Sequence, residues 1–245
     1  MTKDRVNLIL QKWSQYFPSS ETPIGIFYSD ELHGAEDVKK PAPNPHGYTC
    51  IFAQMSRLHK GQALAFSCDN LGCWGSINNI FDGPFCEEAT VNLLCNIEKF
   101  KKDADGVLRM RDVSPKVEPH GKYLIMKPLN LLTEEDEPEI FLCFAKPDTI
   151  AALHSLACFD DSELDAVMTP FGSGCEMAIK FALAESRKER PRCVLGGMDV
   201  AMRACLKADV MTFSIPAKRF QEMVDNMDIS FLDTYIWKGL KNGQR

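Results

Sequence analysis

Two related segments of the chain carry the cysteines that could do chemistry. Residues 45–72 and 170–197 align without a gap at an offset of 125 residues. Both spell Pro-x-Gly-x-x-Cys, then seventeen residues and a second cysteine, then three residues and a glycine. Seven of the 28 aligned positions are identical, whereas average residue frequencies would give about two. The identical pairs are Pro45/Pro170, Gly47/Gly172, Cys50/Cys175, Ala53/Ala178, Leu58/Leu183, Cys68/Cys193 and Gly72/Gly197.

The first cysteine of each segment, Cys50 or Cys175, stands where a helix is predicted to begin. At a helix N-terminus the backbone N–H groups are unpaired and the macrodipole is positive. That position lowers a thiol pKa and favours the thiolate, which ligates metals or attacks electrophiles. The same N–H groups also suit a phosphate or carboxylate, and nearby glycines let the backbone approach such a ligand. The repeat therefore predicts either a thiolate site or an anion site.

A second cluster lies at Cys68 and Cys73, on a glycine-punctuated loop after a predicted strand. Plant-type iron–sulfur sites contain this C-x4-C spacing, but they have further cysteines close in sequence. Here the further thiols would have to come from the repeat. Position 73 corresponds to Met198, so the repeat is not symmetric at this point. The alternative interpretation is a tight turn with two packed thiols.

Other candidate residues are fewer. Asp199 and Arg203 stand four apart on a predicted helix, and we favour a helical ion pair over a shared place in a cleft. Of the five histidines only His46, beside Gly47, is placed near the site. The remaining cysteines fall in apolar helix or strand patterns and are predicted to be core residues: Cys86, Cys95, Cys143, Cys158 and Cys205.

Hydrophobic periodicity places these segments in an alternation of helices and strands, which indicates an α/β or α+β fold. The repeat predicts one domain, residues 1–245, built of two similar lobes that face one another about a pseudo-twofold axis. The lobes would be 1–132 and 133–245, divided at the acidic segment 133–139. The predicted strands are 24–28, 63–67, 123–126, 140–145, 193–195 and 210–215, and the predicted helices are 3–17, 50–60, 87–100, 148–159, 174–188, 199–207, 217–227 and 231–241.

Charge and composition exclude several classes of partner. The chain has 245 residues, 28 basic and 34 acidic, for a net charge of −6, whereas a nucleic-acid binder needs a basic face. The longest apolar run, 140–145, is far too short to cross a membrane. The first residues lead into an amphipathic stretch rather than a signal core. We therefore expect a cytoplasmic protein with reduced thiols and neither nucleic acid nor membrane as partner; a homo-oligomer is left open.

Six stretches resemble the uncharacterised prokaryotic family called domain of unknown function 169, a cysteine-rich group common in archaea and anaerobic bacteria. They are PIGIFYSDE, YTCIFAQMSRLHKGQ, LGCWGS, MTPFGSGCEMA, RCVLGGMDVAMR and ADVMTFSIPAKRFQEMVDN. By this resemblance Cys50, Cys73 and Cys175 fall where family members tend to carry cysteine. Gly75, Asp199 and Arg203 also match its pattern. The resemblance implies no established activity.

Three functions follow from these residues. In the first, Cys50, Cys73 and Cys175 hold zinc or an iron–sulfur cluster between the lobes, with an open fourth position for a small molecule. The second is a binding module for a small anionic ligand or cofactor at the paired helix N-termini. Its residues would be Gly47, Gly72, Gly75, Ser173, Gly174, Asp199 and Arg203. In the third, Cys50 or Cys175 is the nucleophile of a thiol enzyme; the residues do not decide whether the protein is an enzyme.

Overall fold

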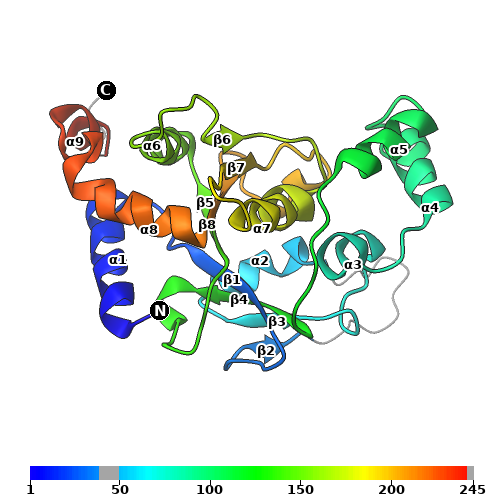
Figure 1. The fold of residues 1–245 in the computed structure, drawn as a ribbon, viewed down its shortest axis with the longest axis horizontal. Coiled ribbons are helices and arrows are strands. Elements are labelled where there is room, and N and C mark those ends of the chain that lie inside the picture. The colour runs from blue at the N-terminus through cyan, green and yellow to red at the C-terminus, as the bar shows by residue number, and fades with distance from the viewer. Residues whose placement is uncertain (39–49, 242–245) are drawn as a thin grey trace.

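One eight-stranded mixed sheet runs through the part of the chain that the structure, a computed structural model, describes: residues 1–38 and 50–241 (Figure 1). Helices cover both faces of this sheet, which confirms a mixed α/β architecture. The strand order is β2-β3-β4-β1-β5-β8-β7-β6. The strands are β1 Ile24–Ser29, β2 Glu36–Asp37, β3 Leu64–Phe66, β4 Tyr123–Pro128, β5 Ile140–Ala145, β6 Val167–Met168, β7 Cys193–Gly196 and β8 Met211–Pro216.

The strand order reads alike from either edge. At the centre β1 pairs antiparallel with β5, the next pairs outward are antiparallel, and the outermost pair at each edge is parallel. The two segments also share a backbone hydrogen bond at the same place. The N–H of Leu129, just after β4, donates to the carbonyl of Pro23, just before β1, at 2.9 Å. The N–H of Ala217, just after β8, donates to the carbonyl of Glu139, just before β5, at 2.8 Å. Segments 1–132 and 133–245 thus meet side by side in one continuous sheet. Their origin by duplication stays a prediction.

The register of the sheet departs from the predicted repeat at its second cysteine. Leu64 of β3 pairs with Met126, two residues before Pro128 at the end of β4. Val194 of β7 pairs with Ser214, likewise two residues before Pro216 at the end of β8. The counterpart of Cys193 is therefore Ala63, which lies in the same core as Cys193, and Cys68 lies on the loop beyond β3. A gapless alignment misses this shift because loop lengths differ between the two segments.

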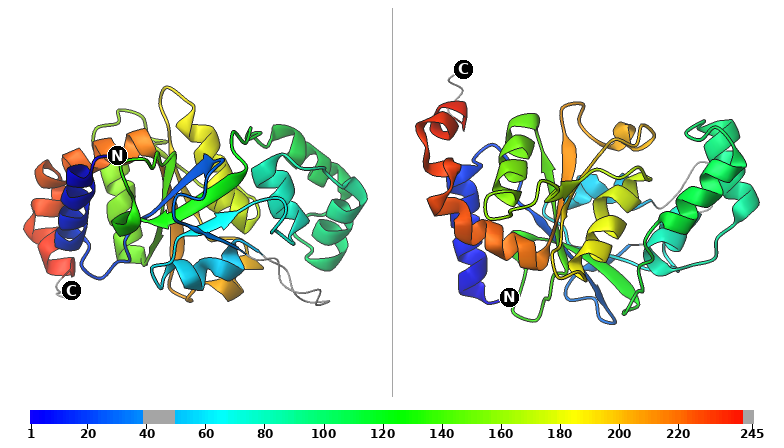
Figure 2. Two further views of the ribbon diagram at one scale, coloured as in Figure 1. Left: turned by 90° about the horizontal axis from the view of Figure 1, so that it is seen from below. Right: turned by 45° about the horizontal axis from the view of Figure 1, so that its top comes forward.

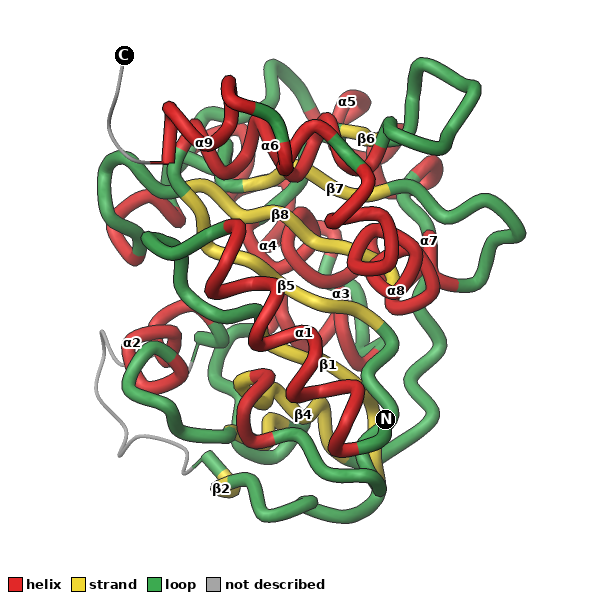
Figure 3. Tube along the Cα trace, turned by 90° about the vertical axis from the view of Figure 1, so that its left-hand side faces the viewer, coloured by secondary structure: helices red, strands yellow, loops and turns green. Residues whose placement is uncertain are grey.

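Each face of the sheet carries its own apolar core, spanning both segments. One face is covered by α1, whose buried stripe Val6, Ile9 and Trp13 has helical spacing, and by α6, α8 and α9. Figure 3 views the sheet from this side, with α1 in front of the strands. Because both faces are covered, every side chain of β5 is buried. The helices of this face are α1 Lys3–Tyr16, α6 Pro147–Ala157, α8 Ala217–Asn226 and α9 Tyr235–Lys241.

The other face is covered by shorter helical segments that carry the candidate cysteines. They are the 3-10 helix η1 Phe52–Gln54, α2 Met55–Leu58, α3 Trp74–Phe81, the π-helix η4 Glu176–Lys180 and α7 Phe181–Ser186. A helical arm projects from this face, away from α1 and α9 (Figures 1 and 2). The arm consists of α4 Glu87–Val91, the π-helix η2 Asn92–Ile97 and α5 Ala104–Val113.

Several predicted elements need correction. The predicted helix 199–207 is only the 3-10 helix η5 Met202–Cys205, because side-chain bonds from Asp199 and Arg203 hold this segment in a tight loop. Helix 87–100 divides into α4 and η2, and helix 50–60 into η1 and α2. The elements α3, α5, β2 and β6 were not predicted; β2 and β6 have two residues each, which is too few to show a periodicity. The described residues include no helix long and apolar enough to span a membrane.

Candidate functional site

Cys175 is placed by a local capping motif. The helical run that continues as η4 and α7 begins at Gly174, directly after Ser173. The N–H and hydroxyl of Ser173 both donate to Glu176 Oε2, at 2.9 and 3.0 Å, and the Ser173 carbonyl accepts from Met177 at 3.0 Å. Ser-x-x-Glu is the sequence signature of a capping box. This signal was available in the sequence and would have identified Glu176.

The Cys175 thiol is shielded rather than activated. Its side chain is 7% exposed and packs in the core beside Ser173 and Ser76, whose hydroxyl oxygens lie 3.4 and 3.8 Å from Sγ. Burial raises the pKa of Cys175 to about 12, although the Ser173 hydrogen bond acts in the opposite direction. The negative charge of Glu176 raises this pKa further. Burial of the thiol therefore opposes the lowering of the pKa that a helix N-terminus predicts, and the pKa of Cys175 is raised.

Cys50 and Cys73 lie near Cys175 on the same face of the sheet. Cys50 precedes η1, and burial raises its pKa although the N–H groups of Ala53 and Phe52 bond to the sulfur. Cys73 is the half-buried N-cap residue of α3 and makes no side-chain capping bond. A charge on Cys73 contributes to the raised pKa of both Cys50 and Cys175, and Ser76, three residues further along α3, lies 3.8 Å from Cys175 Sγ.

A fourth thiol was assigned wrongly from the sequence. Cys205, predicted to be core, is exposed at the end of η5, which packs against η1. A charge on Cys205 also raises the pKa of Cys50, in agreement with the contact between η5 and η1. We call Cys50, Cys73, Cys175 and Cys205 the thiol cluster. No group of three or more His, Cys, Asp or Glu side chains in residues 1–38 and 50–241 is arranged to hold a metal ion.

The other cysteines do not join this cluster. Cys193 is fully buried beside Met223 on the opposite face, so the sheet separates it from Cys175. Cys68 is exposed on its loop and lines a separate hollow of about 520 Å³. Of the five cysteines predicted as core only Cys143 is buried; Cys86 is exposed like Cys205, and Cys95 and Cys158 are partly exposed. His46 and Gly47 lie outside the described residues.

Asp199 and Arg203 do not form the ion pair that we favoured, because each bonds to backbone instead. Asp199 accepts from the N–H groups of Gly174 at 2.7 Å and Ala201 at 2.9 Å. The Arg203 guanidinium donates to the carbonyl oxygens of four residues in the loop from β7 to β8. These residues shape the loop beside Cys175. The four carbonyl groups belong to Gly197, Lys207, Ala208 and Val210.

The positions of the candidate glycines differ in whether a side chain would fit there. A Cβ on Gly174 would come within 2.2 Å of Met202 Sδ, so packing against η5 needs a glycine there. A Cβ on Gly75 would meet only Cys73 Sγ, at 3.8 Å, which is an ordinary contact. Gly72 lies in the loop that leads to Cys73.

A buried charged network extends from Cys175 into the protein. Lys180 donates to Asn79 Oδ1 of α3 at 3.0 Å, to Ser114 Oγ at 2.8 Å and to Glu176 Oε1 at 3.2 Å. Lys180 and Glu176 are both buried. Sequence reasoning missed this network, because only the capping box has a local signal and Asn79 and Ser114 are far away along the chain.

Exposed apolar side chains stand close in sequence to the cysteines of the cluster and to Asp199. Trp74 follows Cys73, Phe171 is 52% exposed four residues before Cys175, and Met198 and Val200 flank Asp199. The arm contacts one of these side chains: Phe100, between η2 and α5, has its ring 6.4 Å from the ring of Phe171. Burial and the charge of Asp199 together raise the pKa of Glu98, at the end of η2. The arm therefore borders the thiol cluster.

Residues 15–226 match the sequence profile of the uncharacterised ArCR proteins, domain of unknown function 169. The chain belongs to this family. No curated protein and no solved structure was found to match it. The ArCR match contains all eight strands and all four thiols of the cluster, and it ends with α8, before α9.

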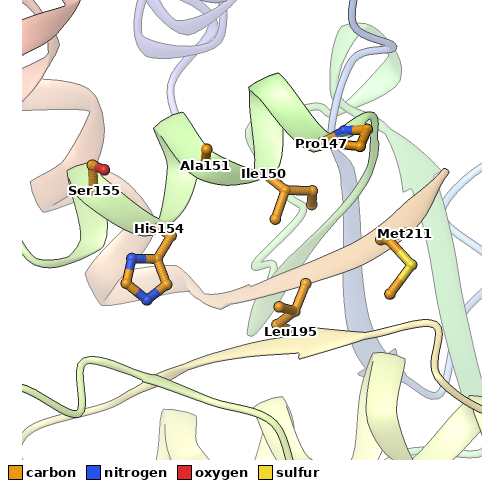
Figure 4. A pocket seen from close by; sticks show the side chains of 7 residues that line it. All are labelled: Pro147, Ile150, Ala151, His154, Ser155, Leu195 and Met211. Atoms are coloured by element: carbon orange, nitrogen blue, oxygen red, sulfur yellow. The ribbon is translucent and has the colours of Figure 1, made fainter. Parts of the chain in front are cut away.

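Two hollows in the described part of this ArCR protein lie away from the thiol cluster. One, of about 450 Å³, is bounded by α6 on one side and by Leu195 of β7 and Met211 of β8 on the other (Figure 4). It lies on the α1 face of the sheet, and Pro147, Ile150 and His154 line its helical wall. The second is the hollow at Cys68. Neither includes a thiol of the cluster.

Proposed function

We propose that this ArCR protein binds a thiophilic metal centre, a zinc ion or an iron–sulfur cluster, through Cys50, Cys73 and Cys175. The observation that carries the proposal is the packing of α3, which begins after Cys73, on Cys175: Ser76 of this helix lies 3.8 Å from Cys175 Sγ. A charge on Cys73 also raises the pKa of both Cys50 and Cys175. These cysteines come from both segments of the sheet and stand at three separate helix starts. We assign the fourth position to Cys205, which is exposed at the end of η5, where η5 packs against η1.

The chemistry of the thiols suits metal capture. Thiolate ligands select zinc and iron–sulfur clusters over hard cations. Burial keeps Cys50 and Cys175 protonated, so an arriving cation would displace their protons and supply the charge that stabilises the thiolates. The thiols are not arranged for ligation beforehand. Metal binding would therefore draw them together, and side-chain rotation is fast enough for this step.

The alternative of an anionic ligand at the helix N-termini has less support. The backbone N–H of Gly174, where the helix begins, already donates to the Asp199 carboxylate. The N–H of Ser173 already donates to the Glu176 carboxylate. The N–H groups after Cys50 bond to its own sulfur. An anion would have to displace these contacts. A thiol enzyme has less support still, since burial raises the pKa of Cys175 to about 12.

Two further proposals accompany this function. The strand order and the matched bonds at Leu129 and Ala217 support an origin of segments 1–132 and 133–245 by duplication of one unit, folded as a single domain. The metal site requires reduced thiols, so we expect the protein to work in the cytoplasm.

The test compares two cysteines that share a local position. Cys73 and Cys86 are both N-cap residues without a side-chain capping bond, on α3 and α4. Protein purified without oxygen, or reconstituted with zinc or with iron and sulfide, should carry metal by elemental analysis, with visible absorption if it holds an iron–sulfur cluster. Cys73→Ser should lose the metal, and Cys86→Ser should retain it. Metal-free wild type after both reconstitutions, or equal loss in both variants, would contradict the proposal.

A further inference from the structure

Lys180 ties three segments of the fold together. Its ammonium group has three N–H donors, and all three are used, by Asn79 of α3, by Ser114 where α5 ends, and by Glu176 of η4. The side chain is 8% exposed. A lysine whose donors are all engaged inside the protein serves as a fixed tie rather than as a base or a nucleophile.

Helix α3 meets η4 at two points along one of its faces. Cys73, Ser76 and Asn79 follow one another at intervals of three residues, so they share a side of the helix. Ser76 donates to Cys175 Sγ at 3.8 Å, and Asn79 accepts from Lys180 at 3.0 Å. The N-terminal end of the same helix carries Cys73. The placement of Cys73 relative to Cys175 therefore depends on how α3 is fastened to η4.

We propose that Asn79 and Lys180 form a positioning pair that holds α3, and with it Cys73, against Cys175. The importance of this pair for metal binding rests on the function proposed above. Helix α3 has eight residues and no side-chain capping bond at Cys73, and so short a helix is marginal by itself. Its place depends on tertiary contacts such as this pair.

The experiment removes the tie without removing a charge. Asn79→Ala leaves Lys180 with Ser114 and Glu176, whereas Asn79→Asp restores an acceptor for the ammonium group. Asn92→Ala is the matched control, since Asn92 accepts only a local bond from Asn96, at 3.0 Å, within the exposed part of the arm. The readout is alkylation of each cysteine by iodoacetamide in the metal-free protein, followed by mass spectrometry. Cys143 and Cys193 serve as internal references for the buried core.

In Asn79→Ala we expect Cys175 to react at least about tenfold faster, because α3 no longer covers it, while both reference cysteines keep their rates. Zinc affinity should fall about 10- to 100-fold, as is usual when a residue behind a ligand is lost. Asn79→Asp and Asn92→Ala should behave as wild type. An unchanged Cys175 rate in Asn79→Ala, or an equal acceleration of Cys143 and Cys193, would overturn the positioning pair.

The labelling result also separates the two proposals. If wild type binds no zinc and no cluster but Asn79→Ala still exposes Cys175, the proposed function fails and the positioning pair stands. If wild type binds metal and Asn79→Ala changes neither the labelling of Cys175 nor the affinity, the positioning pair fails and the proposed function stands.

Discussion

The carboxylate of Asp199 accepts a hydrogen bond of 2.7 Å from the backbone N–H of Gly174. The helix that contains Cys175 therefore begins against a carboxylate from the loop after β7. This contact satisfies one of the N–H groups that a helix start leaves unpaired, and a negative charge is favourable at that end of the helix dipole. It also joins η5 and its exposed Cys205 to the segment that carries Cys175.

Asp199→Ala should destabilise the protein by about 1–2 kcal/mol, because two N–H groups lose their acceptor. The free energy of unfolding in urea measures the effect. Asp209→Ala is the control: Asp209 forms an exposed ion pair of 3.0 Å with Lys146, and solvent screening leaves such pairs little effect on stability. An equal decrease in the free energy of unfolding in the two variants would show that the Asp199 hydrogen bonds do not stabilise the protein more than an exposed ion pair does.

Arg203 should not be replaceable by lysine. Its planar guanidinium bonds to Val210 at 2.5 Å and to Ala208 at 2.7 Å, among four carbonyl groups. An ammonium group cannot reproduce this fork. We expect Arg203→Lys to lose about 1–3 kcal/mol, against roughly 0.5 kcal/mol or less for Arg109→Ala on the exposed side of α5. A lysine variant as stable as wild type would contradict this.

The buried pair of Lys180 and Glu176 should show the cost of an unpaired charge. Lys180→Met alone leaves the Glu176 carboxylate buried without its partner, which typically costs about 3–5 kcal/mol. The double variant Glu176→Gln/Lys180→Met leaves no net buried charge and should be more stable than Lys180→Met. Urea unfolding of the three proteins measures the difference. The opposite order of stability would be incompatible with a buried ion pair.

Stability should fall at alkaline pH through the shielded thiols. An unfolded cysteine titrates near its ordinary value of 9.0, whereas burial raises the pKa of Cys175 to about 12 in the folded protein. The stabilisation is therefore fully present below about pH 9 and is lost as the pH rises towards 12. Cys175→Ser, which does not titrate there, should show a shallower decline of the urea midpoint between about pH 8 and 10. Parallel declines in the two proteins would rule out the shift at Cys175.

Gly174 and Gly75, both beside cysteines of the cluster, should respond differently to an added methyl group. Gly174→Ala places its Cβ within 2.2 Å of Met202 Sδ, and such overpacking costs about 1–3 kcal/mol. Gly75→Ala meets only Cys73 Sγ at 3.8 Å and should be neutral or stabilising by up to about 1 kcal/mol, since alanine favours a helix. Thermal unfolding of both variants tests the contrast. A Gly174→Ala protein as stable as Gly75→Ala would show that Met202 of η5 can move aside without a cost in stability.

Elements with strong local patterns could be predicted from the sequence. The apolar run of residues 140–145 coincides with β5, and the spacing of Val6, Ile9 and Trp13 defines the buried stripe of α1. The helix start at residue 174 is likewise local, because Ser173 and Glu176 cap it within four residues. In each case the determining interactions lie within one or two turns of the chain.

Only the tertiary structure decided which cysteines are neighbours. The sheet places Cys193 on one face and Cys175 on the other, and it brings the exposed Cys205 near Cys50. Asp199 and Lys180 also bond to segments that no spacing rule links to them. The physical reason is that strand order and helix packing are set by contacts between distant residues, whereas sequence patterns report only the contacts that each segment makes with itself. The sequence supplied ten thiols and predicted helix starts at two of them, and the fold determined which four share a face.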